Sequence, residues 1–367
     1  MNPFDFHIPT KILFGRGRIA QLGASLPAGV ERIFLVTDET IATKTPVLDV
    51  TLGALAGRGI KTFARVEENP SLATVEEGAA EARAFKAQLI LGLGGGSPMD
   101  AAKGMAMLAV NAGPLSRYLG GVPLENAPLP VIAIPTTSGT GSEVTPYAVF
   151  TDKDGGNKIG YGHPGIFPII ALMDPELTYS MPTVVVINTG LDVLAHAVEA
   201  YLSTGSFPLN DALALHAVDV VLAHLGRASL KDKEAMDQMA AAAAVAGAAI
   251  AHASTILPHI MGYPLTVFHG VAHGRASAVM MVHVLDALRA KSTCPVKVKT
   301  IDDLFAPHGG PDGFLQGLGV SLKLSEYGVR DDEIALYAQK TIVKGDINIT
   351  PAAITAESLE KIYRSAL

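Results

Sequence analysis

The sequence predicts an α/β domain with a doubly wound, mostly parallel sheet over residues 1–180, followed by an all-α domain over residues 181–367. The chain has 367 residues, and a chain of this length is usually too long to fold around a single hydrophobic core. Short β-branched runs alternate with helix-like segments in the first half, and alanine-rich segments of helical length replace them after Pro182. This change of pattern marks the expected boundary between two domains.

Three short runs in the first half are mostly apolar: Ile33–Val36, Gln88–Leu93 and Val131–Ile134. Helix-like segments such as Thr74–Lys86 and Pro98–Ala109 separate them. Strands that are apolar on both faces and spaced by a helix are typical of a parallel sheet that helices cover on both sides.

The second half contains periodic apolar segments at Gly190–Ser203, Leu209–Leu225 and Ala235–Ala253. Its most apolar stretch, Met239–Ala251, is shorter than the ~20 residues that span a bilayer. We therefore expect buried helices of a helical domain and no interaction with a membrane.

The charge balance excludes some partners. The net charge is −7 and the pI is about 5.9, with no block rich in lysine and arginine, so no nucleic acid is expected to bind. The single cysteine, Cys294, excludes an intrachain disulfide and fits a reducing compartment. Because the N-terminus lacks the apolar core of a signal peptide, we expect a cytoplasmic protein.

A glycine-rich turn joins an expected strand to an expected helix in Leu89–Lys103. Gly94, Gly95 and Gly96 let the backbone adopt angles that other residues resist and let a ligand approach the main chain. Ser97 is expected to cap the following helix, whose free N–H groups would attract a phosphate. An ordinary tight turn is the alternative. The G-x-G-x-x-G pattern is absent, so a standard Rossmann motif is not predicted.

A second turn, Pro135–Thr145, follows the run that ends at Ile134. Five hydroxyl residues and two glycines lie close together in it. Such a surface could bind phosphate or ribose, or it could be a simple Ser/Thr turn. The presence of the first glycine turn favours a binding role.

Two acidic residues lie near these turns. Asp38 follows Ile33–Val36, and a carboxylate after an early strand of a nucleotide fold commonly accepts the ribose hydroxyls and repels a 2′-phosphate. It therefore predicts NAD in preference to NADP. Asp100 lies in the first turn of the expected helix, where it could contact a ligand hydroxyl or offset the helix dipole.

A possible metal site begins with Asp192 and His196, which are spaced i and i+4 and so share one helix face. Their neighbours are apolar, so the carboxylate would be buried and would need compensation. With His259 and His273 they would form a set of one oxygen and three nitrogens that suits a divalent transition metal. A surface pair on the helix is the alternative for the first two residues.

Taken together, these motifs resemble those of the iron-containing (group III) alcohol dehydrogenase family, and the resemblance extends over nearly the whole chain. The motifs that carry the resemblance are Phe14–Gly17, Glu68–Pro70, Gly94–Lys103, Pro135–Glu143, Gly190–Glu199 and His273–Gly274. It implies the dehydroquinate synthase-like fold, with a dinucleotide-binding domain before a helical domain that binds the metal and the substrate. It also implies that Asp192, His196, His259 and His273 are the metal ligands.

The resemblance further implies a cofactor site. Lys158 falls where the family places a lysine near the nicotinamide ribose, and Leu177 where it lines the adenine pocket. The predicted cofactor-binding residues are Asp38, Asn69, Gly94, Gly95, Gly96, Ser97, Asp100, Thr136, Thr137, Thr140, Tyr147, Lys158 and Leu177.

The chain departs from the family pattern at one position. The family often has His-x₃-His-x₉-His, whereas this chain has Tyr263 between His259 and His273. Tyrosine has a pKa near 10 and is not a base at neutral pH without help. Tyr263 and His269 are therefore the predicted, weak candidates for assisting proton transfer.

The predicted activity is reversible hydride transfer between a small alcohol and NAD, with the metal as the Lewis acid. Fe²⁺ is the expected metal and Zn²⁺ the alternative, the substrate is an alcohol or aldehyde, and the protein is expected to form a homodimer. Related non-alcohol chemistry remains an alternative: a polyol or maleylacetate-type reductase, or a dehydroquinate synthase-like lyase. A non-catalytic nucleotide-binding protein is a further one.

Overall fold

A computed structural model describes residues 3–153 and 155–367. By contacts the chain divides into two compact units. The first, which we call the α/β unit, is His7–Met181. The second, the helical unit, is Pro182–Leu367 together with the N-terminal stretch that ends at Phe6.

The α/β unit is built on a six-stranded sheet with the order β1-β8-β5-β4-β2-β3. Every pairing in this sheet is parallel. The strands are β1 (Lys11–Phe14), β2 (Arg32–Val36), β3 (Gly59–Phe63), β4 (Leu89–Gly94), β5 (Val131–Pro135) and β8 (Ile170–Met173). A separate antiparallel hairpin consists of β6 (Tyr147–Asp152) and β7 (Asn157–Gly162).

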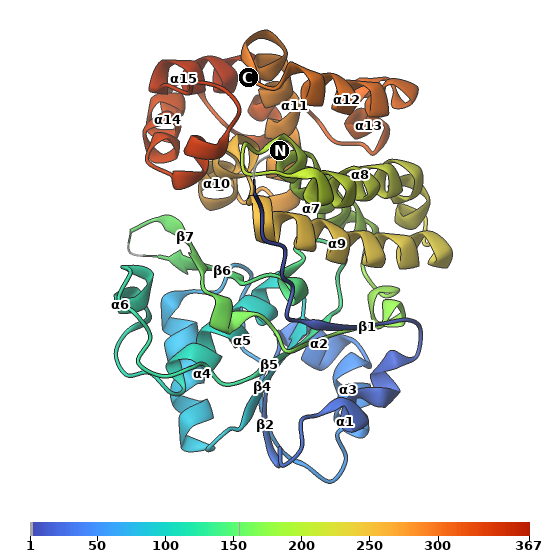
Figure 1. Cartoon of the computed structure of the whole chain (residues 1–367), viewed down its shortest axis with the longest axis vertical. Helices are drawn as coiled ribbons and strands as arrows, with labels where there is room; N and C mark the ends of the chain where they lie inside the picture. The colour runs from blue at the N-terminus through green and yellow to red at the C-terminus, as the bar shows by residue number, and fades with distance from the viewer. Residues whose placement is uncertain (1–2, 154) are drawn as a thin grey trace. The chain divides into compact units, whose positions relative to one another are not determined.

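Helices cover both faces of this sheet (Figure 1). On β2, Phe34 and Val36 join one hydrophobic cluster, and Ile33 and Leu35 join the other. The first cluster includes residues of α4 (Leu72–Ala84), α5 (Gly96–Leu108) and α6 (Leu115–Leu119). The second includes residues of α1 (Leu22–Ser25), α2 (Glu39–Lys44) and α3 (Val47–Ala54). This burial of alternate residues on both faces confirms the predicted doubly wound fold class.

The strand order fixes where a ligand would bind in this unit. From β2 the chain continues outward to β3 on one side, and from β4 it continues to β5 and β8 on the other. In open α/β sheets ligands bind at the carboxyl ends of the strands where the order diverges in this way. That point lies between β2 and β4.

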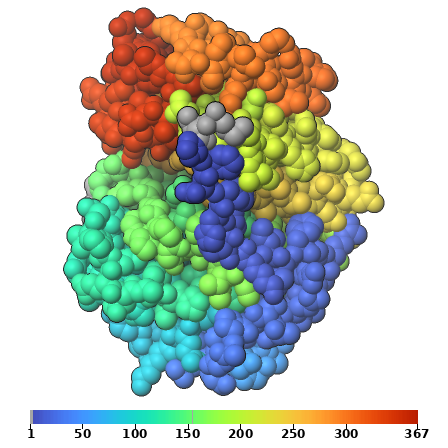
Figure 2. Space-filling model, viewed as in Figure 1, coloured from blue at the N-terminus to red at the C-terminus, as the bar shows by residue number. Residues whose placement is uncertain are grey.

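The helical unit has α7 (Thr183–Leu202) at its centre, packed most extensively against α8 (Pro208–Ser229), α9 (Lys233–Ala253) and α11 (His273–Lys291). The others are α10 (Leu257–His269), α12 (Pro295–Phe305), α13 (Gly310–Gly317), α14 (Ile334–Ile342) and α15 (Ala356–Ser365). The last two pack against each other at the surface of this unit (Figures 1 and 2). No described residue after Met173 lies in a strand.

Helix α7 is long and apolar enough to cross a membrane by composition, and α9 with α10 would count as a bent pair. Within the most apolar window of α7, however, 67% is buried inside the protein. This burial is what the central helix of a packed helical unit requires.

Two helix starts differ from the sequence prediction. The helix expected from Gly190 begins at Thr183, because packing overrides the low helix propensity of the β-branched residues that precede Gly190. The helix expected from Pro98 begins at Gly96 with Gly95 as its N-cap, so Ser97 lies within the first turn and does not cap it.

Candidate active site

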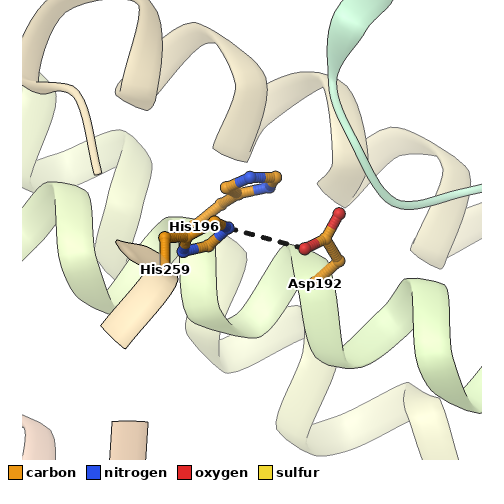
Figure 3. Close-up of side chains that lie close together, drawn as sticks. All are labelled: Asp192, His196 and His259. Atoms are coloured by element: carbon orange, nitrogen blue, oxygen red, sulfur yellow. Dashed lines mark ion pairs between the residues drawn. The ribbon is translucent and has the colours of Figure 1, made fainter. Parts of the chain in front are cut away.

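The compact polar cluster of the helical unit contains Asp192 and His196 from α7 and His259 from α10 (Figure 3). Each residue offers one potential ligand atom, and these atoms all lie within 4.8 Å of one another. The residues are only 3%, 5% and 2% exposed. Three side chains of types that ligate metals thus converge in an apolar interior, a number that is typical of a catalytic metal site.

The atoms of the cluster fit a divalent cation. Oδ1 of Asp192 and Nε2 of His259 are 3.6 Å apart, too far for a hydrogen bond, and neither has a hydrogen-bond partner among the described residues. Burial alone would raise the pKa of the Asp192 carboxyl, but the imidazoles of His196 and His273 hold that pKa well below its usual range. A buried, ionised carboxylate needs a positive charge beside it, and a divalent cation bound by Asp192 and the neutral imidazoles would supply that charge.

The fourth predicted ligand lies at the edge of this cluster. Nε2 of His273 is 3.9 Å from Oδ1 of Asp192, and its ring meets that of His259 edge-on with 5.1 Å between centroids. The His273 side chain is 28% exposed, compared with 4% for Asp192. The structure therefore brings all four predicted ligands together, with His273 on the open side.

A glycine allows α11 to bring His273 against α7. A Cβ atom at Gly274 would lie 2.2 Å from the carbonyl oxygen of Asn188 and 2.6 Å from Cβ of Asp192. No side chain fits at this distance. The residue after His273 must be glycine for the first turn of α11 to contact the helix that carries Asp192.

Tyr263 lies one helical turn after His259, and its ring centroid is 5.8 Å from that of His273. The ammonium of Lys344 lies 5.9 Å from the Tyr263 ring centroid, a contact between residues 81 positions apart that no local pattern predicts. His269 is placed in a different polar cluster, where Nε2 lies 2.6 Å from the hydroxyl of Tyr337. Of the two predicted proton-transfer residues, Tyr263 is therefore the one whose ring lies beside a predicted ligand.

In the α/β unit, the two predicted cofactor turns lie in direct contact. A Cβ at Gly96 would lie 2.6 Å from Cγ2 of Thr140, and one at Gly95 would lie 3.3 Å from Oγ1 of Thr137. The backbone N–H of Thr136 donates to the carbonyl oxygen of Gly94 at 2.9 Å. The turns thus form one surface around the N-terminus of α5, where unpaired N–H groups favour a phosphate.

Asp38 lies at the carboxyl end of β2, beside this surface. Its Oδ1 accepts a hydrogen bond from the N–H of Ile41 and so caps α2. Its Oδ2 lies 3.3 Å from the point where a Cβ on Gly94 would stand. The carboxylate therefore flanks the glycine turn at the point where the strand order diverges.

Ser97 and Asn69 connect a third segment to the glycine turn. The backbone N–H of Asn69 donates to Oγ of Ser97 at 3.0 Å. Asn69 has a φ of 57°, a left-handed conformation that asparagine tolerates better than most residues. This bond holds the segment around Asn69 beside the first turn of α5.

Asp100 has a structural role in this arrangement. Its Oδ1 accepts from the hydroxyl of Ser142 at 2.6 Å, and its Oδ2 accepts from the N–H of Val149 at 2.9 Å. Both oxygens are thus engaged by donors from the second turn and the hairpin, which favours positioning of these segments over contact with a ligand.

Lys103 is a buried cation that the sequence analysis did not identify. It is 0% exposed, and its ammonium donates to Oγ of Ser142 and to the carbonyl oxygens of Thr145 and Tyr147. Burial lowers its pKa to about 8. The pattern Asp-Ala-Ala-Lys indicates a helix-surface pair from sequence alone, so only the folded structure shows that this lysine fastens the second turn to α5.

The remaining predicted cofactor residues lie in three places. Tyr147 begins β6, and its ring lies 2.9 Å from the point where a Cβ on Gly162 would stand. Lys158 on β7 is 4% exposed and pairs with Thr151 across the hairpin. Leu177 packs into the hydrophobic cluster on the α2 and α3 face of the sheet.

The buried carboxyl group of Glu143, in the second turn, should make the stability of the protein depend on pH. Burial raises the pKa of Glu143 to about 7, and Oε1 has no hydrogen-bond partner among the described residues. Because the folded state binds the proton more tightly than the unfolded state, the free energy of unfolding falls as the pH rises from about 4.5 to about 7. The slope is at most about 1.4 kcal/mol per pH unit. We expect Glu143→Gln, which does not titrate, to gain stability relative to the wild type as pH rises through this range.

Urea unfolding of both proteins at about pH 5 and about pH 8 measures this difference. A Glu143→Gln variant whose stability difference from the wild type is the same at both pH values would contradict the raised pKa.

Comparison with known proteins assigns both halves of the chain to one family. Residues 9–175 match iron-containing alcohol dehydrogenase, and residues 186–367 match the C-terminal part of the Fe-containing alcohol dehydrogenase family. The chain is 36% identical over 305 residues to long-chain-alcohol dehydrogenase 1 of Geobacillus thermodenitrificans, covering 81% of this chain and 75% of that protein. It is 28% identical over 386 aligned residues to NAD-dependent methanol dehydrogenase of Bacillus methanolicus, covering 99% of this chain and 100% of that protein.

The fold leads to the same assignment. A crystal structure of an iron-containing alcohol dehydrogenase from Thermotoga maritima superposes with a TM-score of 0.91 at 35% identity, covering 100% of this chain and 99% of that chain. The match extends over both units, and the resemblance predicted from the motifs is confirmed. The chain belongs to the iron-containing alcohol dehydrogenase family.

Proposed function

We propose that this protein is a metal-dependent, NAD(H)-linked alcohol dehydrogenase that also reduces aldehydes. The observation that carries the proposal is the buried cluster of Asp192, His196 and His259, with a carboxylate oxygen and an imidazole nitrogen that no protein donor or acceptor satisfies. A protein that only binds nucleotides has no need for this costly arrangement.

Asp192, His196, His259 and His273 would hold the metal, since one carboxylate and three imidazoles suit Fe²⁺ or Zn²⁺. When bound, such a metal supplies Lewis acidity that lowers the pKa of an alcohol hydroxyl. We favour Fe²⁺ because the family is named for it, with Zn²⁺ as the alternative. The buried side of the cluster limits access of bulk water to the carboxylate, and the more exposed His273 marks the side from which a substrate would enter.

The surface formed by the glycine turn and the second turn would bind NAD, which accepts a hydride in alcohol oxidation. The N-terminus of α5 offers its N–H groups to the pyrophosphate, and Ser97, Thr137 and Thr140 offer side-chain hydroxyls beside it. The relative from Bacillus methanolicus is named as NAD-dependent, which supports the choice of cofactor. Lys158, Tyr147 and Leu177 are proposed to complete this site.

Asp38 is the residue that we propose selects NAD over NADP. In Asp38→Asn the helix cap of α2 is kept, because asparagine caps about as well as aspartate, but the charge that repels a 2′-phosphate is lost. We expect the ratio of kcat/KM for NADP⁺ to that for NAD⁺ to rise about tenfold, or about 1.4 kcal/mol. Steady-state kinetics with both cofactors measures it.

Asp49→Asn, an exposed substitution on α3 with the same change in charge, is the matched control and should leave the ratio unchanged. An Asp38→Asn variant whose cofactor ratio equals that of Asp49→Asn would remove this role from Asp38.

Tyr263 is proposed to assist the departure of the alcohol proton through hydrogen bonds, because its ring lies beside His273. Its usual pKa near 10 makes it a poor base at neutral pH, so its contribution would be smaller than that of the metal. His269 is the weaker candidate, since Tyr337 already engages its ring nitrogen.

A substrate screen tests the proposed function. Metal-loaded protein is assayed with NAD⁺ and NADP⁺ in parallel on neutral primary alcohols of increasing length and on polyols. The corresponding aldehydes and maleylacetate are assayed with NADH. The relatives named for methanol and for long-chain alcohols leave the preferred length open. We expect reversible turnover of at least one neutral alcohol with NAD⁺. Turnover confined to polyols or to maleylacetate, or no turnover of any alcohol or aldehyde, would overturn the proposal.

Three further proposals complete the assignment. Residues 1–180 are proposed to form the NAD-binding domain and residues 181–367 the domain that binds the metal and the substrate, although by contacts the stretch that ends at Phe6 groups with the helical unit. The protein is proposed to be a homodimer, and it is proposed to be cytoplasmic.

A further inference from the structure

Glu199, which is not one of the predicted site residues, has a buried carboxylate that contacts the metal cluster. Glu199 lies on α7 at the i+7 position from Asp192 and the i+3 position from His196, so all three side chains share one helix face. It is 0% exposed. A carboxylate in such a place is costly unless both of its oxygens are engaged.

Both oxygens of Glu199 are engaged by α10. Oε1 forms a hydrogen bond with Nδ1 of His259. Oε2 accepts from the backbone N–H of Ile256 at 2.7 Å and from that of His259 at 3.4 Å. Ile256 is the N-cap residue of α10 and has no side chain that can cap. Glu199 therefore caps α10 from another helix, where a negative charge is also favoured by the helix dipole.

The chain is strained where α10 begins. Helices α9 and α10 meet at an angle of 110°, and between them Ser254 has φ 57° and ψ 179°, a region that residues other than glycine rarely adopt. Oγ of Ser203 donates to the carbonyl oxygen of Ala253 at 2.7 Å. Contacts from α7 thus hold the bend that sets the position of His259.

The bond to Glu199 decides which nitrogen of His259 is available to a metal. When Glu199 is ionised, its Oε1 accepts a hydrogen bond from Nδ1 of His259, and in the neutral imidazole that binds a metal Nε2 then keeps the lone pair. Nε2 is the atom that lies 3.6 Å from Oδ1 of Asp192. We infer that Glu199 is a positioning residue that fixes the tautomer and the orientation of His259 for metal binding, an inference that rests on the proposed metal site.

The test compares metal affinity in two variants. In Glu199→Gln the amide oxygen can still accept from Ile256, but the amide nitrogen donates to Nδ1 and so favours a proton on Nε2, the wrong tautomer. Asp232→Asn is the matched control, because Asp232 caps α9 in the same unit by accepting from the N–H of Ala235. Metal-free protein is titrated with Zn²⁺ in competition with a chromophoric chelator, without substrate or cofactor.

We expect the Kd for Zn²⁺ to rise about 10- to 100-fold in Glu199→Gln and to stay within about twofold of the wild type in Asp232→Asn. Equal affinity of Glu199→Gln and the wild type would overturn the inference and leave the proposed function intact. A wild-type protein that fails to bind Zn²⁺ or Fe²⁺ would instead overturn the proposed metal site, and the inference with it.

A second measurement uses only the wild-type protein and so tests the inference even if Glu199→Gln does not fold. Nitrogen-15 spectra of the Zn²⁺-bound wild type, labelled at histidine, report which ring nitrogen of His259 carries the proton. We expect a proton on Nδ1 of His259. A proton on Nε2 would overturn the assignment of Glu199.

Discussion

Asp192→Asn is expected to lose alcohol oxidation almost completely. Asparagine has nearly the same shape, but it removes the only predicted ligand that carries a negative charge, so three neutral imidazoles and an amide would have to hold a cation in a buried site. Metal catalysis of this kind contributes several kcal/mol, and about 4 kcal/mol corresponds to about a thousandfold in rate. Bound metal, measured by elemental analysis, should fall together with the rate of NADH formation.

Asp219→Asn is the control for this substitution, because Asp219 is an exposed aspartate on α8 and the change in charge is the same. It should keep its metal and its rate. If Asp192→Asn kept both as well, Asp192 would not be a ligand and the reaction would not depend on this cluster.

Gly274→Ala is expected to destabilise the helical unit and to weaken metal binding. A Cβ at Gly274 would lie 2.2 Å from the carbonyl oxygen of Asn188 and 2.8 Å from the backbone nitrogen of Asp192, and backbone atoms do not move unless α7 moves. Overpacking of this kind typically costs about 1–3 kcal/mol or more. Because the shift would separate His273 from Asp192, the Kd for metal should rise as the free energy of unfolding falls.

Gly226→Ala, in the same unit, is expected to have the opposite effect on stability. Gly226 lies inside α8, and nothing lies within 4 Å of the Cβ that would be added. Alanine there should stabilise the protein by about 0.5–1 kcal/mol. Unfolding in urea and chelator competition on both variants test the contrast, and a Gly274→Ala variant that behaved like Gly226→Ala would show that the close approach of α11 to α7 is not needed.

Three of the buried strands of the α/β unit, β2, β4 and β5, could be predicted because their signal is local. The runs around Phe34, Ile90 and Ile132 are apolar on both faces, a pattern that is typical of a covered parallel sheet. Strands β1, β3 and β8 and the β6–β7 hairpin were not predicted. β1 is a short edge strand with mostly exposed residues, β3 is only partly buried, and β8 has only four residues. The hairpin includes polar positions along its length. Their pairing depends on neighbours that are distant in sequence.

In the candidate site, too, the residues with a local sequence signal could be predicted and those that depend on distant contacts could not. Asp192 and His196 could be identified from i, i+4 spacing in apolar surroundings, because one helix carries both. His259 and His273 come from separate helices, so only the family resemblance pointed to them. Lys103 and Glu199 were missed as buried charges, because at their sequence positions they resemble ordinary helix-surface residues and their partners lie 39 and 60 residues away.

The most direct test of the proposed metal-dependent activity is a metal titration of alcohol oxidation. Wild-type protein is depleted with a strong chelator, and NADH formation from a neutral alcohol and NAD⁺ is followed without oxygen as Fe²⁺ or Zn²⁺ is added back. The four-ligand site predicts a negligible rate in the depleted protein and a linear recovery that ends at a single metal ion per chain. A full rate in rigorously depleted protein would contradict it.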